Sequence, residues 1–361
     1  MRYIRLLKQL IDLTLLSCSM LTLSQVARCG IIISMVRFVL IDGNAIMHRA
    51  FHALPPLTNR SGELLNAVYG FSTMLLKVIA DLKPDYLAVA FDTPAPTFRK
   101  MLYLGYQAKR PVMDEGLSGQ FPYAYEVVKS MGVTLVQKEG YEADDVIGTL
   151  AQRAVHRTKG IVHSGIDEVV IVTGDRDLYQ LVNEKVKIYG PVRGLSEAEM
   201  FDEKRIEEKM GVRADQIVDY KGLVGDGSDN YPGVAGVGPK TAVNLIREFG
   251  DLGDIYRNLD KAGEKFGEKV KEKLIKGEEL GKLSYKLATI VKNVPLSVKL
   301  DKCRFEFNDQ VKESLANQMR QLGFKSIAER LEGREKQEAR GPYRVNGKRD
   351  KKKGDGQLGL L

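Results

Sequence analysis

Acidic residues recur along this chain at points where a strand or a turn is expected to end. Three acidic clusters follow apolar, β-branched runs at Phe38–Ile41, Tyr86–Phe91 and Val169–Val172, and such runs are typical of buried parallel strands. The nine acids are Asp42, Asp92, Glu142, Asp144, Asp145, Asp175, Asp177, Asp226 and Asp229. Because ligands bind outside the carboxyl ends of strands in open α/β sheets, we expect these carboxylates to share one crevice.

So many negative charges in one crevice raise each other's pKa unless a cation compensates for them. Carboxylate oxygens are the ligands that hard divalent cations prefer, so the pattern predicts a site for Mg²⁺ or Mn²⁺. For any single cluster, a turn-forming or helix-capping aspartate is an equally good interpretation, and Asp177 is a candidate cap. The five clusters taken together favour the metal site.

The composition is consistent with an anionic substrate. The chain has 361 residues and a formal net charge of +8, although the nine acids count against that value. A basic surface around an acidic pocket suits a polyanion that is cut at metal ions. With four histidines, and with Cys18, Cys29 and Cys303 lacking metal-ligand spacing, a histidine-based zinc site is disfavoured and a reducing compartment is expected.

Residues 1–34 differ from the rest of the chain, and we expect a leader or upstream extension that is not part of the fold. Lys8 and Asp12 interrupt its apolar stretch, which is then too short and too polar for a membrane span. A poor signal peptide is the alternative. Met35 directly precedes the first expected strand.

Residues 35–195 alternate between strand and helix patterns, which predicts a doubly wound, mostly parallel α/β sheet. Strands are expected at 36–42, 86–91, 133–136, 169–173 and 186–189, and helices at 64–80, 120–131, 142–155 and 177–183. Within this domain, residues 94–140 form what we call the arch segment, which is rich in proline, glycine, basic and aromatic residues. Long insertions beside active sites are often lids or gates, although an ordinary surface loop has a similar composition.

Residues 196–331 are expected to form a helical domain. The helices are predicted at 202–210, 215–223, 239–249, 265–276 and 310–331. Residues 233–238, here called the hairpin turn, are glycine-rich and precede Lys240, which is typical of a helix-hairpin-helix element. Gly236 and Gly238 permit close approach of another backbone, and the following helix N-terminus offers N–H groups to phosphate. A plain helix-turn-helix packing element is the alternative.

The chain ends in a polar, lysine-rich tail at residues 332–361, which is expected to be disordered. Apolar residues return abruptly in its last five positions. Leucines at the free end of a polar tether suggest a partner's apolar pocket. The candidate partner-binding residues are Gln357, Leu358, Leu360 and Leu361.

Five motifs carry a resemblance to a known family: LIDGNAIMHRAFHALP, AVAFDTPAPTFR, GYEADDVIGTLA, VTGDRDLYQLV and GLVGDGSDNYPGVAGVGPKTA. In their order and spacing, residues 36–331 resemble the bacterial 5′→3′ exonuclease and flap endonuclease family, which has a PIN-like α/β domain with a helical arch. The resemblance implies a structure-specific nuclease that hydrolyses DNA at two Mg²⁺ or Mn²⁺ ions. It assigns Asp42, Asp92, Glu142, Asp144 and Asp145 to the first metal position, and Asp175, Asp177, Asp226 and Asp229 to the second.

The resemblance also implies roles for basic residues. Arg49, Arg99, Tyr106 and Arg110 match positions around the scissile phosphate and the arch, and carbonyls of the hairpin turn would bind a monovalent cation such as potassium. One position departs from the family pattern, because Gln107 stands where an active-site lysine is expected. Lys109 would substitute if the helix start shifts, and otherwise we expect a reduced rate.

The implied partners are DNA with 5′ ends or 5′ flaps and, through the terminal pentapeptide, the bacterial β sliding clamp. We expect a cytoplasmic, nucleoid-associated monomer that does not bind membranes and acts in primer removal and DNA repair. Two other function classes remain open: a structure-specific DNA-binding protein with weakened catalysis, and a phosphotransferase or RNA-cleaving relative. The arch segment and the hairpin turn argue against the latter.

Overall fold

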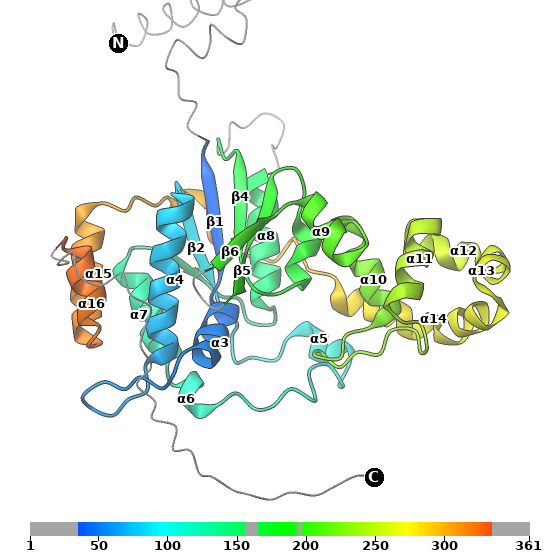
Figure 1. Cartoon of the computed structure of the whole chain (residues 1–361), viewed down its shortest axis with the longest axis horizontal. Coiled ribbons are helices and arrows are strands. Elements are labelled where there is room, and N and C mark those ends of the chain that lie inside the picture. Colours follow the sequence, from blue (N-terminus) through cyan, green and yellow to red (C-terminus); the bar gives the residue numbers. More distant parts are fainter. Residues whose placement is uncertain (1–34, 156–164, 194–196, 334–361) are drawn as a thin grey trace, which may run out of the picture.

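The computed structural model describes residues 35–155, 165–193 and 197–333 (Figure 1). The expected leader, residues 334–361 of the expected tail and the candidate clamp motif within them lie outside the described residues. Among the described residues, no helix is both long and apolar enough to cross a membrane.

A six-stranded sheet forms the centre of the described chain, with the strand order β3-β2-β1-β4-β5-β6. Its strands are β1 (Arg37–Asp42), β2 (Tyr86–Ala90), β3 (Thr134–Val136), β4 (Glu168–Val172), β5 (Val186–Arg193) and β6 (Glu197–Phe201). The first five strands are parallel, and β6 pairs antiparallel with β5. The order reverses beside β1, so a topological switch point lies at the carboxyl ends of β1 and β4.

Helices cover both faces of the sheet, which explains why the central strands β1, β2 and β4 are almost continuously apolar. One face of β1, carrying Val39 and Ile41, packs against α3 (Gly43–Ala53), α4 (Asn66–Leu82) and α7 (Phe121–Ser130). The other face, carrying Phe38 and Leu40, packs against α8 (Ala143–Val155). The prediction of a doubly wound, mostly parallel sheet is confirmed.

The part of the arch segment that leaves this α/β layer is shorter than expected. It contains two short helices, α5 (Phe98–Leu102) and α6 (Glu115–Ser118), joined by turns and extended chain. Residues 121–136 return to the layer as α7 and β3, because apolar residues such as Val127 and Val128 are completely buried there. The segment free of the layer therefore ends near residue 120.

A helical region follows the sheet and shares one continuous core with the α8 face. Its elements are α9 (Glu203–Met210), α10 (Ile217–Val224), α11 (Pro239–Phe249), α12 (Leu252–Arg257), α13 (Leu259–Phe266) and α14 (Glu268–Ala288). Short 3₁₀ helices within the described residues are η2 (Asp177–Leu181), η3 (Ala214–Gln216) and η4 (Leu300–Cys303). Figure 1 shows α11–α14 extending away from the sheet. The hairpin turn connects to α11, as the sequence predicts.

The structure differs from the sequence prediction in one domain boundary and in one helix. The predicted boundary at residues 195 and 196 falls between the paired strands β5 and β6, so the sheet continues to Phe201. The expected helix 310–331 is two helices, α15 (Asp309–Gln321) and α16 (Lys325–Leu331), separated at Gly323 with φ +83°. Both pack beside α4 and α7, at the opposite end of the molecule from α11–α13 (Figure 1). The chain thus returns to the α/β layer to close its core.

The placement of α15 in the core of the α/β layer can be tested by mutation. Met319 is completely buried against the sheet-facing core, and Met319→Ala should lower the free energy of unfolding by about 2–5 kcal/mol because it leaves a cavity. Urea denaturation measures the effect, with the exposed Glu313→Ala on the same helix as the control. Equal stability of the two variants would contradict the placement of α15 in the core.

Candidate active site

Asp42 and Asp92 lie at the carboxyl ends of the neighbouring parallel strands β1 and β2. Asp42 pairs in the sheet with Ala90, two residues before Asp92. The Asp42 carboxylate is buried, accepts a hydrogen bond from the main-chain N–H of Ala45 at 2.9 Å, and accepts another from the Thr173 hydroxyl at 2.8 Å. It therefore also caps α3. This junction confirms the expectation that strand ends bring these acids together.

The first turn of α8 brings three further acids to this edge. The N–H of Ala143 donates to Asp92 Oδ1 at 2.7 Å, which joins the start of α8 to the end of β2. Carboxylates at a helix N-terminus are favoured by the helix dipole and the unpaired N–H groups. Glu142 and Asp144 are partly buried, whereas Asp145 is completely buried.

Asp145 is held differently from the other acids. Its two oxygens accept hydrogen bonds from both terminal nitrogens of Arg99 at 2.7 and 2.8 Å, and from the main-chain N–H groups of Glu142 and Val291 at 3.1 and 2.8 Å. Four bonds occupy the four acceptor positions of a carboxylate. Metal ligation by Asp145 would compete with these bonds, which join Asp145 to the start of α8, to Arg99 and to Val291.

Arg99 is correspondingly buried, with 2% of its surface exposed. Besides Asp145, it contacts Glu142 at 3.2 Å and donates to the carbonyls of Leu287 and Thr289 at 2.8 and 2.9 Å. Four hydrogen bonds to Asp145, Leu287 and Thr289, together with the contact to Glu142, thus engage the guanidinium within the protein. Arg99 ties α5 to α8 and to the end of α14, and the expected phosphate contact stays a prediction.

The remaining acids come from the loop after β4 and the loop after α10. Lys221, on α10, lies between them: its Nζ contacts Asp177 Oδ1 and donates to Asp226 Oδ2 at 2.7 Å. Asp175 is exposed beside them and accepts from the N–H of Asp177 at 2.8 Å. The loop 225–233 is closed by two bonds between Asp226 and Tyr231, which fixes the direction of Asp226.

Asp229 faces the arch segment. Its carboxylate accepts a hydrogen bond from Arg110 at 2.5 Å and lies 3.1 Å from the Tyr106 hydroxyl. Tyr106 is 3% exposed and stacks on Tyr231, and its expected contact with DNA stays a prediction. Gln107 adopts a left-handed conformation with φ +56°, and its Nε2 is 3.5 Å from Asp229. Residues 104–109 form turns rather than a helix, so no helix start brings Lys109 into the site.

The electrostatics of the site are those of crowded carboxylates. Burial, with charges of neighbouring acids, raises the pKa of Asp42 and of Glu142 to about 7 and that of Asp177 to about 6. Burial and the charges of Asp175 and Asp42 raise the pKa of Asp144 well above its ordinary value. Although burial raises the pKa of Asp226, hydrogen bonds from Lys221 and Ser228 lower it to about 2.

The acids of the site differ in whether an internal cation accompanies them. Among the described residues, Asp42 and Asp144 have no basic partner, whereas Asp177, Asp226 and Asp229 do. Within the described ranges, no group of three or more acids, histidines or cysteines is arranged to hold a metal ion as the side chains stand. The donor chemistry fits divalent cations, because uncompensated oxygen ligands at raised pKa are stabilised by such ions.

The hairpin turn has an exposed, glycine-rich apex, and two of its valine side chains are buried. Val234 and Val237 are buried, while Gly236, Gly238 and Lys240 are exposed. Gly236 has φ +78°, a conformation that favours glycine, and Gly238 caps α11 before Pro239. Arg49 is partly buried on α3, and Lys109 is exposed on the arch segment. DNA binding by these residues stays a prediction.

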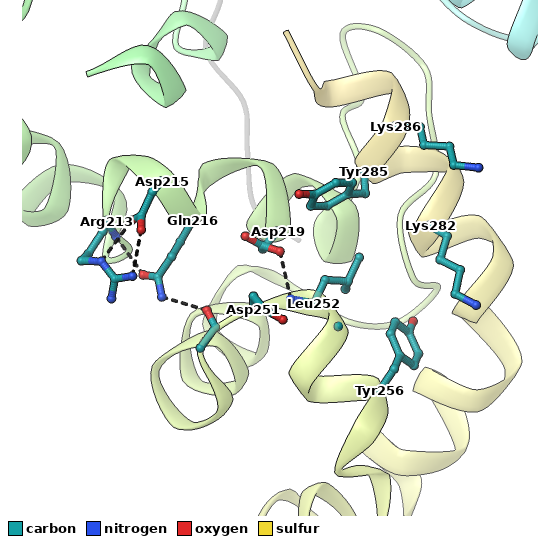
Figure 2. A pocket seen from close by; sticks show the side chains of 12 residues that line it. Arg213, Asp215, Gln216, Asp219, Asp251, Leu252, Tyr256, Lys282, Tyr285 and Lys286 are labelled. Atoms are coloured by element: carbon teal, nitrogen blue, oxygen red, sulfur yellow. Dashed lines mark hydrogen bonds and ion pairs between the residues drawn. The ribbon is translucent and has the colours of Figure 1, made fainter. Parts of the chain in front are cut away.

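A hollow of about 860 Å³ lies on the helical region, between α10, α12 and α14. Three pairs form within its lining (Figure 2): Arg213 with Asp215, Gln216 with the Gly250 carbonyl, and Asp219 with the N–H of Leu252. The nine acids do not line this hollow. The candidate chemistry therefore lies at the carboxylate edge of the sheet.

Sequence reasoning missed two functional candidates, Lys221 and Thr173. In the sequence, Lys221 resembles any of the many surface lysines. Its burial between two acids depends on a contact with Asp177, which is distant in sequence. Thr173 directly follows β4 and donates to Asp42. The polar residue at the end of an apolar run was the available signal for Thr173.

Comparisons with known proteins agree with this arrangement of sheet, carboxylate edge and helical hairpin. The model of the 5′-3′ exonuclease N-terminal resolvase-like domain matches residues 37–211, and that of the 5′-3′ exonuclease C-terminal SAM fold matches residues 212–311. A 5′-3′ exonuclease of Aquifex aeolicus is 36% identical over 293 residues, which cover 81% of this chain and 94% of that protein. The chain belongs to the 5′-3′ exonuclease family.

Longer relatives and solved structures extend the comparison. DNA polymerase I of Caldicellulosiruptor bescii is 43% identical over 299 residues, covering 82% of this chain, and the match spans only 33% of that protein. The T5 D15 protein co-crystallised with metal ions superposes with a TM-score of 0.57 at 19% identity, covering 81% of this chain and 99% of that chain. The catalytic core of Rad2 with DNA substrate gives 0.52 at 18% identity, covering 82% and 92%. These structures confirm the fold.

The raised pKa values predict a pH dependence of stability in the absence of divalent ions. Because the folded-state pKa of Asp42 is about 7 and its ordinary value is 3.8, the folded chain binds more protons between these pH values. The free energy of unfolding should therefore increase as the pH falls from 8 towards 5. Asp226 does not oppose this, since its pKa of about 2 lies below the window.

Asp42→Asn provides the matched test, because asparagine retains an oxygen for the Ala45 N–H. At pH 8 it should be more stable than the wild type by about 1 kcal/mol or more, since one pKa unit corresponds to about 1.4 kcal/mol. Urea denaturation at pH 5, 6, 7 and 8 in EDTA measures both effects. A wild-type stability that rises with pH in this range would contradict the assignment.

Proposed function

We propose that this chain hydrolyses DNA phosphodiesters at 5′ ends and 5′ flaps, as a divalent-metal-dependent 5′→3′ exonuclease and flap endonuclease. The observation that carries the proposal is the cluster of buried carboxylates at the switch point of the sheet, in which Asp42, Glu142 and Asp144 have raised pKa values. Such acids are arranged to receive cations and not to act as isolated charges. Membership of the 5′-3′ exonuclease family supports the reaction class.

Eight of the nine acids would hold the ions. Asp42, Asp92, Glu142 and Asp144 would hold the first ion, and Asp175, Asp177, Asp226 and Asp229 the second. Two Mg²⁺ or Mn²⁺ ions would supply activation of the attacking water and stabilisation of the leaving oxygen in an in-line displacement. The T5 D15 protein, which shares the fold, was crystallised with metal ions.

The other side chains of the site would orient the acids and neutralise charge. Lys221 holds Asp177 and Asp226 in the absence of ions, and its ammonium adds a positive charge beside the second position. Arg110, whose side chain is 52% exposed, is bonded only to Asp229 in the site and is the basic residue of the arch segment best placed to meet a phosphate. Arg99 and Asp145 act as positioning residues, because their donors and acceptors are already used.

The arch segment and the hairpin turn would select the substrate by its shape. The free part of the arch segment closes over the acidic edge, since Tyr106, Gln107 and Arg110 all approach Asp229. The hairpin turn would hold the duplex through backbone contacts, which position DNA without reading its sequence. Docking on the β sliding clamp through residues 357–361 stays a prediction.

A second candidate function is structure-specific DNA binding with weakened catalysis. Gln107 favours it, since its amide carries no charge where an ammonium is expected, and it lies only 3.5 Å from Asp229. The position is close enough to the site for the missing charge to affect the rate.

Removal of the acids distinguishes these functions. Asp226→Ala and Asp175→Ala should each abolish cleavage of a labelled 5′-flap duplex in Mg²⁺ while leaving DNA binding largely intact, because loss of an acid reduces repulsion of phosphate. Glu264→Ala, which removes an exposed acid from α13, is the control for total charge. Wild-type cleavage rates in either acid variant would rule out the assigned metal positions.

The arch segment gives a separate test. Gln107→Lys should raise the single-turnover cleavage rate by restoring a cation beside Asp229, and Arg110→Gln should lower it about 10²-fold by removing the existing one. Lys109→Ala should have little effect, because Lys109 is exposed on a turn outside the site. If the rate is unchanged in both Gln107→Lys and Arg110→Gln, the arch segment does not supply charge to the reaction.

A further inference from the structure

One contact at the hairpin turn is made by a side chain that the proposed function does not use. Lys273, on the second turn of α14, donates from Nζ to the main-chain carbonyl of Gly236 at 2.9 Å. A Cβ built at residue 236 would lie 3.0 Å from Lys273 Cε and 3.1 Å from Nζ. The ammonium therefore reaches the apex of the turn because that residue is glycine.

The contact is part of a close packing interface between α14 and the hairpin turn. Gly277 and Gly281 follow Lys273 at intervals of four, on the same helix face. A Cβ at these glycines would lie 2.7 and 3.0 Å from the Val234 side chain, so both positions admit Val234. Ser284 continues this face and accepts a hydrogen bond from the N–H of Gly233 at 3.0 Å. The turn is thus held at its base by Ser284 and at its apex by Lys273.

Lys273 differs from other lysines of the same helix. Lys271, Lys276 and Lys282 each pair with carboxylates. For Lys273, by contrast, no carboxylate of the described residues lies within ion-pair distance in the structure, and its side chain is exposed. An ammonium has three donors, of which Gly236 uses one. Two donors therefore remain for a ligand that approaches the turn from outside.

The surroundings of this ammonium favour an anion. The helix α11 begins immediately after the turn, with Gly238 as its cap and Pro239 at its first position. The N–H groups of its first turn lack partners within the helix, and the positive end of the helix dipole lies there. Lys240 adds a second exposed positive charge. A phosphate at the apex would meet the ammonium and the helix N-terminus together.

We propose that Lys273 is the cation of the hairpin turn, whose ammonium, held by the Gly236 carbonyl, binds a backbone phosphate of duplex DNA. It thereby replaces the monovalent metal ion that the sequence resemblance implies at this turn. The inference rests on the proposed function, since it takes duplex DNA as the ligand. A potassium ion at the Gly236 carbonyl would need to displace an ammonium of the same charge, so the residues present do not fit an additional ion.

The experiment compares duplex binding in two salts at one ionic strength. Fluorescence anisotropy of a labelled duplex with a 5′ flap is measured in two buffers that both contain EDTA. One contains KCl, and the other contains tetramethylammonium chloride, whose cation is too bulky to sit at a carbonyl of the turn. The wild type should bind equally in both salts. Lys273→Met should bind about tenfold more weakly in tetramethylammonium chloride. It should recover in KCl, because potassium can enter the vacated position.

Two variants serve as controls. Lys276→Met removes the same charge from α14, but its ammonium pairs with Glu272 within the helix, so its binding should stay within about twofold of the wild type. Lys273→Arg keeps the charge and should keep the affinity in both salts. Potassium-dependent binding by the wild type, equal binding by Lys273→Met and Lys276→Met in tetramethylammonium chloride, or no recovery of Lys273→Met in KCl would each overturn the proposal.

Cleavage of the same flap in Mg²⁺ is scored separately. If the wild type does not cut the flap but its duplex binding depends on Lys273, the proposed catalytic function is contradicted and this inference is supported. A wild type that cuts flaps with the Lys273→Met affinity unchanged in both salts would remove only the inference.

Discussion

Repulsion among buried carboxylates is the constraint on which the rest of this structure depends. Parallel strands deliver Asp42 and Asp92 to one edge, and α8 adds Glu142 and Asp144 to it. Main-chain N–H groups offset part of the charge, as at Asp42 and Asp92. Three basic side chains from distant parts of the chain, Arg99, Arg110 and Lys221, offset another part. Asp42 and Asp144, which have no basic partner among the described residues, carry raised pKa values and are well prepared to exchange protons for metal ions.

The internal cations also join parts of the chain that would otherwise be independent. Arg99 comes from α5, yet its partners lie at the start of α8 and at the end of α14. Lys221 comes from α10 and reaches Asp177 beside the sheet. Removing one partner from a buried ion pair leaves an uncompensated charge, which is strongly destabilising. The geometry of the acidic edge therefore depends on the helical region, and the two parts are coupled through the site itself.

The apolar runs made the first five strands predictable, because a strand buried on both faces must be apolar along its length. The strand β6 was missed because its sequence, Glu197–Phe201, lies at the sheet edge with mostly exposed side chains and pairs through its backbone. The motifs placed the acids correctly at the ends of β1 and β2. They did not distinguish Asp145 from its neighbours, because the buried state of Asp145 and Arg99 depends on carbonyls and N–H groups near residue 290. Contacts between residues so far apart in sequence leave no local pattern.

The helix α14 links the two ends of the proposed DNA path. Near its start, Lys273 touches the apex of the hairpin turn, and at its end the Leu287 carbonyl receives Arg99 beside the acidic edge. At 1.5 Å per residue, the helix between these two contacts spans roughly 21 Å. One strand of duplex DNA advances 3.4 Å per nucleotide, so this distance corresponds to about six base pairs. In the proposed function, this fixed length would set the distance from the duplex contact at Lys273 to the acidic edge, and the position of the cut would then depend on helix length rather than on DNA sequence.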